Sequence, residues 1–363
     1  MYKEFYGLED LPFTLTPDPR FIVFTPSYNE VLASLYYGLE NAKGLIVLTG
    51  EVGTGKTTAL RWILRRLDSS VLAAYVFNPR LSVDEFYHHV TQMLGIKEWS
   101  NKSDLLSTLG RTLDDRHRRG LRTVLIIDEA HQLSEYVLEE IRLLLNFESD
   151  TAKHLQIILT GQTELREVLN KPALRQLKQR VALRCNMHAL PNVEEVERYI
   201  TERLLIAGSE QPNIFTPGAM DFIFQCSDGI PRQINNLCDN ALLAGYASGE
   251  QVIGRQIIEQ VAENLDLLPD RDALAMQEQR SEYVSSARVL KAEARELWGG
   301  GPTRVEHTPK NNVSNASQNG QNGAATNGAA AANGGGNGNA KNDPFEELDD
   351  EVSLEIEEIG GFY

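Results

Sequence analysis

The sequence predicts an α/β fold with a parallel β-sheet, followed by a small domain made only of helices. Three observations indicate this fold. A Gly-rich loop follows an apolar run near residue 50, strand-like apolar runs alternate with helix-compatible segments as far as about residue 190, and only helical patterns occur from residue 192 to residue 265. Alternating strands and helices are typical of doubly wound α/β layers.

The Gly-rich loop fits the P-loop pattern G-x-x-x-x-G-K-[ST] at every fixed position. Its residues are Gly50, Glu51, Val52, Gly53, Thr54, Gly55, Lys56 and Thr57. In this pattern the glycines let backbone N–H groups close around phosphate oxygens, and the following helix N-terminus adds a partial positive charge. Lys56 is expected to reach the β- and γ-phosphates of a nucleotide, and the Thr57 hydroxyl is expected to bind Mg²⁺.

Five apolar runs predict the strands of the sheet. They lie at 45–48, 71–77, 123–127, 155–159 and 181–185. The third run is apolar without interruption, which is typical of a strand buried on both faces of a parallel sheet. Helices are expected in the connecting segments, at 28–41, 58–64, 82–94, 103–118, 136–147, 164–169 and 172–178.

Residues 1–30 are rich in aromatic residues and prolines. The prolines rule out a long helix here. The aromatic side chains are expected to pack this segment onto the domain that follows it. Beyond residue 190, helical patterns predict a small helical lid, with helices at 193–207, 217–227, 231–247 and 254–265.

The C-terminal part of the chain differs in composition. A polar helix is expected at 272–298, and residues 311–342 are almost entirely Asn, Gly, Ala, Gln and Ser, which predicts a flexible linker. Residues 343–363 carry nine acidic residues and no basic one, so the rest of the chain has a net charge of −7 rather than −16. Acidic and apolar residues interleave there, which favours either a peptide that orders on a partner or a solubilising tail.

These patterns divide the chain into five parts. They are an α/β domain with its N-terminal segment (1–190), a helical lid (191–268), a helical extension (269–300), a low-complexity linker (301–342) and an acidic tail peptide (343–363).

Composition limits the partners and the location. The net charge argues against bulk nucleic-acid binding. An arginine-rich stretch at 111–122 is expected to be a solvated face or a subunit contact, with direct DNA contact as the alternative.

The three cysteines have no metal or redox spacing and are expected to be buried thiols. The N-terminal residues do not have the pattern of a signal peptide, and no apolar run approaches the roughly 20 residues that span a bilayer, so neither feature is expected. The predicted location is the cytoplasm, or the inner face of a membrane as a peripheral protein.

Two acidic residues follow the third strand. Asp128 is expected to hold Mg²⁺ through water, and Glu129 is expected to orient and deprotonate the attacking water. His131 completes the letters of a helicase box, but no second recombinase-like domain follows, so His131 is expected to be structural. Thr160, at the end of the next strand, is expected to hydrogen-bond the γ-phosphate or the water, with Gln162 as the alternative.

Arginine supplies the positive charge that a loose phosphoryl-transfer transition state needs. Arg232 begins a helix of the lid, where the lid is expected to face the nucleotide. Arg180 precedes the fifth strand and is expected to reach a neighbouring subunit's site as an arginine finger, with Arg175 as the alternative. Such a finger changes the rate by about 10³–10⁵, so a monomer is expected to be nearly inactive.

Together these residues resemble the AAA+ ATPases and, within them, the general secretion pathway protein A (ExeA) type. The resemblance covers about residues 1–268. It rests on the opening motifs Phe5-Tyr6-Gly7-Leu8, Pro12-Phe13 and Thr16-Pro17-Asp18-Pro19-Arg20, the loop from Gly50 to Thr57 with Thr58, and the later motifs Ile127-Asp128-Glu129-Ala130-His131, Leu159-Thr160-Gly161-Gln162 and Gly229-Ile230-Pro231-Arg232-Gln233-Ile234-Asn235.

The resemblance implies a P-loop NTPase (AAA+) with a five-stranded parallel sheet, a helical lid, and nucleotide-dependent assembly into a ring or partial ring. It implies Arg232 as sensor 2, Thr160 as sensor 1, Arg180 as the finger, and Asn78 as a restraint on the catalytic glutamate. Secretion proteins of this type often add a membrane span and a periplasmic peptidoglycan-binding module, whereas this chain continues into a low-complexity, acidic extension.

The expected function is ATP binding and hydrolysis, with Mg²⁺, that drives assembly or remodelling of a bacterial envelope secretion, pilus or exopolysaccharide-export system. Lys56, Thr57, Asp128 and Glu129 are expected to carry hydrolysis. The expected partners are further copies of the chain and export proteins. The alternatives are a DNA-binding, ATP-dependent helper of transposition or replication, and a nucleotide switch that recruits a partner through the acidic tail.

Overall fold

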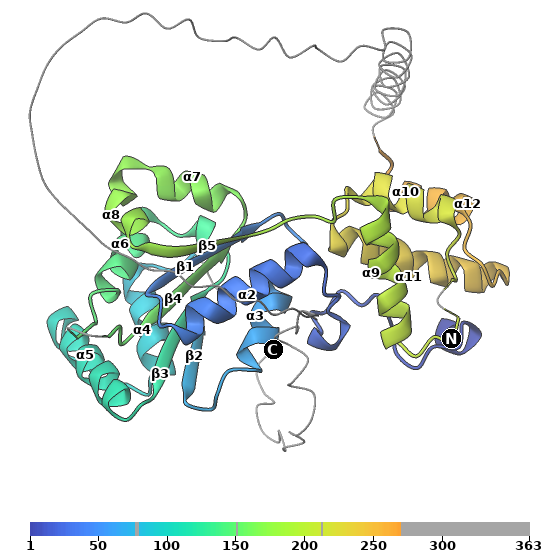
Figure 1. The fold of residues 1–363 in the computed structure, drawn as a ribbon. Coiled ribbons are helices and arrows are strands. Elements are labelled where there is room, and N and C mark those ends of the chain that lie inside the picture. Colours follow the sequence, from blue (N-terminus) through green and yellow to red (C-terminus); the bar gives the residue numbers. More distant parts are fainter. Residues whose placement is uncertain (77–79, 150–151, 212, 270–363) are drawn as a thin grey trace, which may run out of the picture. The chain divides into compact units, whose positions relative to one another are not determined.

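The computed structural model describes residues 1–76, 80–149, 152–211 and 213–269 (Figure 1). The expected helix at 272–298, the linker and the acidic tail lie outside the described residues, and so does Asn78. None of the helices in the described ranges combines the length and the apolar composition that a bilayer span requires. The three cysteines are buried free thiols, as expected.

Five parallel strands form one sheet in the order β2-β3-β4-β1-β5 (Figure 1). This arrangement confirms the predicted five-stranded parallel sheet. The strands are β1 (Leu45–Gly50), β2 (Val71–Val76), β3 (Arg122–Ile127), β4 (Gln156–Gly161) and β5 (Val181–Met187). Every residue of β1 and β4 is buried, because these strands lie inside the sheet and helices cover both of its faces.

Each face of the sheet is covered by its own set of helices. Alternate residues of the strands, such as Leu45 and Val47, belong to a core cluster with apolar residues of α4 to α8. Ile46 points to the other face, toward α2. A Cβ added at Gly38 of α2 would lie only 2.7 Å from the Cδ1 atom of Ile46. On this face α3 contacts both α2 and β1. The helices are α2 (Pro26–Glu40), α3 (Lys56–Leu64), α4 (Val83–Met93), α5 (Lys102–Arg118), α6 (Glu135–Leu144), α7 (Glu164–Asn170) and α8 (Arg175–Gln179).

Several helices begin where the sequence supplies a capping side chain. Before α4, the Ser82 hydroxyl accepts from the Glu85 N–H, and the Glu85 carboxylate accepts from the Ser82 N–H, which forms a capping box. The Asn192 side chain caps α9 (Val193–Ile206) in the same position, and it accepts from the Glu195 N–H at 2.9 Å. These caps satisfy backbone N–H groups that have no partner within the helix.

A helical lid follows the sheet domain, as predicted. It contains α9 (Val193–Ile206), α10 (Pro217–Ser227), α11 (Pro231–Ser248) and α12 (Arg255–Asn264). Between α10 and α11, Asp228 and Gly229 both have positive φ angles. A Cβ on Gly229 would lie 2.1 Å from the Leu190 carbonyl oxygen, so glycine is required at this close approach.

The N-terminal segment packs differently from the expectation. Tyr6, Phe13 and Phe21 are buried in the core of the lid rather than against the domain that follows the segment in sequence. Phe24 contacts α3 edge-to-face, with its ring centroid 5.6 Å from that of Trp62. The expectation was wrong for most of the aromatic residues. Their apolar character predicts burial, but it does not indicate which domain they pack against. The segment contains α1 (Tyr2–Phe5) and the 3₁₀ turn η1 (Pro19–Phe21).

Candidate nucleotide-binding site

The P-loop connects the carboxyl end of β1 to the first turn of α3. Gly53 and Gly55 have φ angles of 86° and 97°, which L side chains rarely adopt. A Cβ on Gly53 would also lie 2.5 Å from the Cβ of Arg232. Glycine is therefore needed both for the backbone conformation and for the close approach of the lid. The free N–H groups at the start of α3 make this turn suited to anions.

Lys56 is buried at the first position of α3. Its ammonium donates to the carbonyl oxygens of Gly50 and Glu51, at 2.9 and 2.8 Å. Burial lowers the pKa of Lys56, and the nearby carboxylates, Glu129 first among them, act in the opposite direction. A buried ammonium held within the loop is suited to a charge-assisted hydrogen bond with a phosphate group.

Asp128 directly follows β3, and its side chain forms a hydrogen bond with a residue of the P-loop. One carboxylate oxygen, Oδ2, accepts from the Thr57 hydroxyl at 3.3 Å and from the Tyr75 hydroxyl at 2.9 Å. The other, Oδ1, accepts from the Glu129 N–H at 2.9 Å. A threonine hydroxyl beside a carboxylate provides the oxygen ligands that Mg²⁺ prefers, so the residues present fit this ion.

Glu129 follows Asp128 with a φ angle of 51°, in the left-handed region. This backbone conformation, rare for a residue other than glycine, turns its side chain away from the strand. Its carboxylate accepts from the Gln162 amide at 3.4 Å and lies 3.5 Å from His131 Nδ1. His131 Nδ1 also accepts from the Gln162 N–H. His131 therefore ties the turn after β3 to the end of β4.

Thr160 is the second-last residue of β4. Its side chain is fully buried, and its hydroxyl has no hydrogen-bond partner among the described residues. A buried hydroxyl without a partner costs about 1–3 kcal/mol, so a ligand or water that accepts its proton would be favoured. Gln162, the alternative, engages Glu129 instead.

Arg232 brings the lid to the P-loop. It is the second residue of α11, and its N–H donates to the Gly53 carbonyl oxygen at 3.1 Å. Arg180 and Arg175 do not line the cavity that contains Lys56 and Arg232. The Arg180 guanidinium contacts the Leu145 carbonyl oxygen at 3.4 Å instead. The structure therefore brings Arg232, but neither Arg175 nor Arg180, to the P-loop of the same chain.

Three of the five arginines in the stretch 111–122 pair with carboxylates of the same domain. Arg118, Arg119 and Arg122 pair with the carboxylates of Asp114, Asp115 and Glu40. Arg116 donates to the Thr123 hydroxyl and to the Arg122 carbonyl oxygen. These contacts give the arginines structural partners within the domain.

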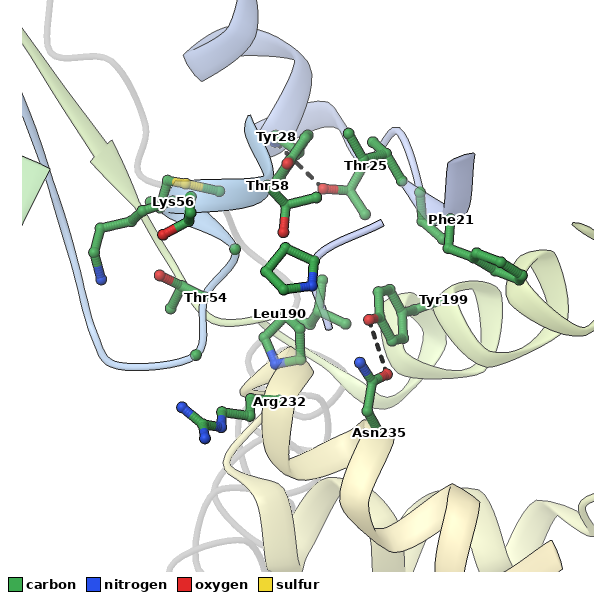
Figure 2. Close-up of a pocket in the computed structure, with 18 of the residues that line it drawn as sticks. Phe21, Thr25, Tyr28, Thr54, Lys56, Thr58, Leu190, Tyr199, Arg232 and Asn235 are labelled. Carbon is green, nitrogen blue, oxygen red and sulfur yellow. Dashed lines mark hydrogen bonds between the residues drawn. The ribbon is translucent and has the colours of Figure 1, made fainter. Parts of the chain in front are cut away.

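A cavity of about 370 Å³ lies beside the P-loop (Figure 2). The P-loop borders one side of it, and Tyr199 of α9 and Asn235 of α11 border the other. The Tyr199 hydroxyl donates to Asn235 Oδ1 at 3.0 Å. The N-terminal segment supplies much of the remaining lining, including Pro17, Ile22 and Tyr28.

Some of the lining residues, such as Tyr28 and Tyr199, lie outside the motifs that carry the resemblance. Tyr28 lies on α2 beside the P-loop, with its ring 3.6 Å from the position of a Cβ on Gly55. Arg203 lies at the lid side and donates to the carbonyl oxygens of Pro12 and Phe21. The sequence signals for this part of the site are the motifs that contain Pro17 and Asn235 and the aromatic and Pro-rich composition of residues 1–30.

Comparison with known proteins agrees with this geometry. The family model of the AAA domain matches residues 39–169. General secretion pathway protein A from Aeromonas hydrophila is 41% identical over 264 residues, which cover 70% of this chain and 46% of that protein. The chain thus spans about half the length of this curated relative.

Solved structures share the fold at low sequence identity. Cdc6p from Pyrobaculum aerophilum has a TM-score of 0.55 and 17% identity, and the match covers 71% of this chain and 70% of that one. The ORC2 protein of Aeropyrum pernix, solved as ADPNP-ADP complexes, has a TM-score of 0.53 and 16% identity, with 70% and 71% covered. At these identities the likeness concerns the fold alone.

Proposed function

This chain contains an AAA domain of the general secretion pathway protein A type, and from that premise we propose that it binds ATP with Mg²⁺ and hydrolyses it to drive assembly or remodelling of an envelope export system. One observation carries the proposal of hydrolysis. Lys56, Thr57, Asp128 and Glu129 converge at the carboxyl edge of the sheet, where Arg232 of the lid also reaches the P-loop. The export role rests on the similarity to the Aeromonas hydrophila protein.

Each of these residues would have a separate role in ATP binding and hydrolysis. The P-loop N–H groups and Lys56 would hold the phosphates, and Thr57 and Asp128 would hold Mg²⁺, which neutralises charge on the phosphate oxygens when it is bound. Glu129 would accept a proton from the attacking water. Its contact with Gln162 keeps the carboxylate 3.4 Å from an amide donor that lies beside the end of β4.

Arg232 would add positive charge from the lid side. Because its backbone N–H is bonded to Gly53, a movement of the P-loop would be transmitted directly to α11. Thr160, whose hydroxyl finds no partner in the described part of the chain, would use this hydroxyl at the γ-phosphate or at the attacking water. We assign the protein to the cytoplasm or to the periphery of the inner membrane face, as an assembly of several copies.

Glu129→Gln is expected to leave ATP binding intact and to lower turnover by about 10²–10⁴-fold, the usual contribution of a general base. The amide keeps the size of the side chain but cannot accept the proton. Binding of a fluorescent ATP analogue and phosphate release, measured on the same preparation, separate the two effects. Glu135→Gln is the matched control, because Glu135 pairs with Lys171 rather than facing the P-loop. Turnover that survives in Glu129→Gln would show that Glu129 is not the base.

Duplex DNA is expected to leave ATP turnover unchanged, because three of the five arginines of 111–122 pair with carboxylates of the same domain. Turnover per protomer is instead expected to rise steeply with protein concentration. Phosphate release measured with and without DNA across a salt series tests the first statement, and phosphate release across a series of protein concentrations tests the second. Strong stimulation that fades steeply with salt would indicate phosphate contacts and a DNA-dependent helper instead.

A further inference from the structure

The register of the sheet brings Tyr75 beside Asp128, at the end of β3. β2 pairs with β3 so that Tyr75 lies opposite Ile126 and Val76 lies opposite Ile127. Ile127 belongs to the core cluster under α4 to α8. Residues that alternate with it, Ile126 and Asp128, therefore point to the opposite face. Tyr75 shares that face with them, one strand away.

The phenol of Tyr75 reaches the carboxylate of Asp128. Its hydroxyl lies 2.9 Å from Oδ2, closer than the Thr57 hydroxyl, which lies 3.3 Å from the same atom. The Glu129 N–H binds Oδ1 at 2.9 Å. Donors on both oxygens fix the plane of the carboxylate, which would otherwise rotate about its last bond. Asp128 is only 9% exposed, so water competes little for these positions.

The phenol can only act as a donor in this contact. A carboxylate accepts and has no proton to give. The contact is therefore a hydrogen bond that holds the Asp128 carboxylate in one orientation.

We propose that Tyr75 is a positioning residue that orients the Asp128 carboxylate for the Mg²⁺ that accompanies the nucleotide. This inference rests on the proposed function, because it assumes that Asp128 and Thr57 hold the ion. Partners of metal-binding carboxylates orient them, and their removal typically weakens metal binding by about 10–100-fold. The Thr57 contact is the longer of the two and is expected to hold Asp128 less firmly alone.

The test is Tyr75→Phe in the full chain, which keeps the ring and removes only the hydroxyl. Binding of a fluorescent ATP analogue is titrated with Mg²⁺ and is also measured in EDTA. The apparent Mg²⁺ affinity is expected to fall about tenfold, while binding in EDTA stays unchanged. Saturating Mg²⁺ is expected to restore turnover. Tyr87→Phe is the matched control, because its phenol also donates to a carboxylate, Glu140, at 2.8 Å and away from the P-loop.

A double-mutant cycle with Asp128→Asn separates positioning from a general effect on folding. If Tyr75 acts through Asp128, Tyr75→Phe adds no further loss of Mg²⁺ affinity in the Asp128→Asn background. An additive loss, or an unchanged Mg²⁺ titration in Tyr75→Phe, would overturn the inference while leaving the proposed function in place. Nucleotide binding by the unmodified chain that does not respond to Mg²⁺ would overturn both.

Discussion

Lys56→Ala is expected to abolish ATP binding, with an affinity loss of at least about 100-fold. The ammonium sits at the first position of α3, and its two hydrogen bonds go to carbonyl oxygens of the P-loop. Phosphate oxygens would replace these carbonyls as its acceptors. Each hydrogen bond to a charged group contributes about 1.5–3 kcal/mol, so the loss of two such bonds is sufficient for this effect, at about 1.4 kcal/mol per tenfold change.

Titration with a fluorescent ATP analogue measures this loss directly. Lys97→Ala is the matched control, because Lys97 is an exposed lysine between α4 and α5. Removal of the buried ammonium also leaves the Gly50 and Glu51 carbonyls without their donor, so the melting temperature is recorded for each variant. ATP binding by a folded Lys56→Ala protein at normal affinity would contradict the role of the P-loop.

The sheet could be predicted from the sequence because its strands are buried on both faces. Such strands form continuous apolar runs, and the run 123–127 became β3, Arg122–Ile127, almost unchanged. The apolar run at 155–159 predicts the fourth strand, whereas β4 extends to Gly161 and includes Thr160. Because Thr160 is polar, the apolar run ends before the strand does.

The order of the strands could not be predicted in the same way. β1 lies between β4 and β5, although neither neighbours it in sequence. No local pattern encodes such a pairing, since it depends on how the crossover helices pack. The resemblance implied a five-stranded sheet, and the structure supplied its order and register.

The same difference separates the two halves of the candidate site. The P-loop and the acidic pair after β3 are contiguous motifs, so the sequence alone singled them out. Tyr75 occupies an ordinary strand position, and only the register with β3 places it beside Asp128. Tyr199 lies in the middle of an amphipathic helix and is 7% exposed. Its place in the cavity depends on how the lid packs against the N-terminal segment.

Arg180→Ala is expected to lower ATP turnover by about 10³-fold or more, within the range known for arginine fingers. The guanidinium lies at the end of α8, outside the cavity of its own chain. Its hydrogen bond to the Leu145 carbonyl is long, at 3.4 Å, and a neutral acceptor of this kind leaves the positive charge available to a neighbouring subunit. ATP binding to the isolated site is expected to persist. Phosphate release per protomer, measured at high protein concentration, gives the loss.

Arg175→Ala is the matched control, because Arg175 begins the same short helix. A loss confined to Arg175→Ala would make Arg175 the finger. Equal losses in both variants would point to assembly through α8 rather than to a finger. Sedimentation at the same protein concentrations shows whether either variant still assembles.

Mixing two inactive variants tests action in trans. Glu129→Gln retains Arg180, and Arg180→Ala retains Glu129, so a mixed assembly contains interfaces in which both groups are intact. With random equal mixing in a head-to-tail assembly, about one quarter of the interfaces are complete. Turnover is therefore expected to recover to about that fraction. If the mixture assembles and stays inactive, Arg180 does not act on its neighbour, and the charge at the transition state must come from Arg232 of the same chain.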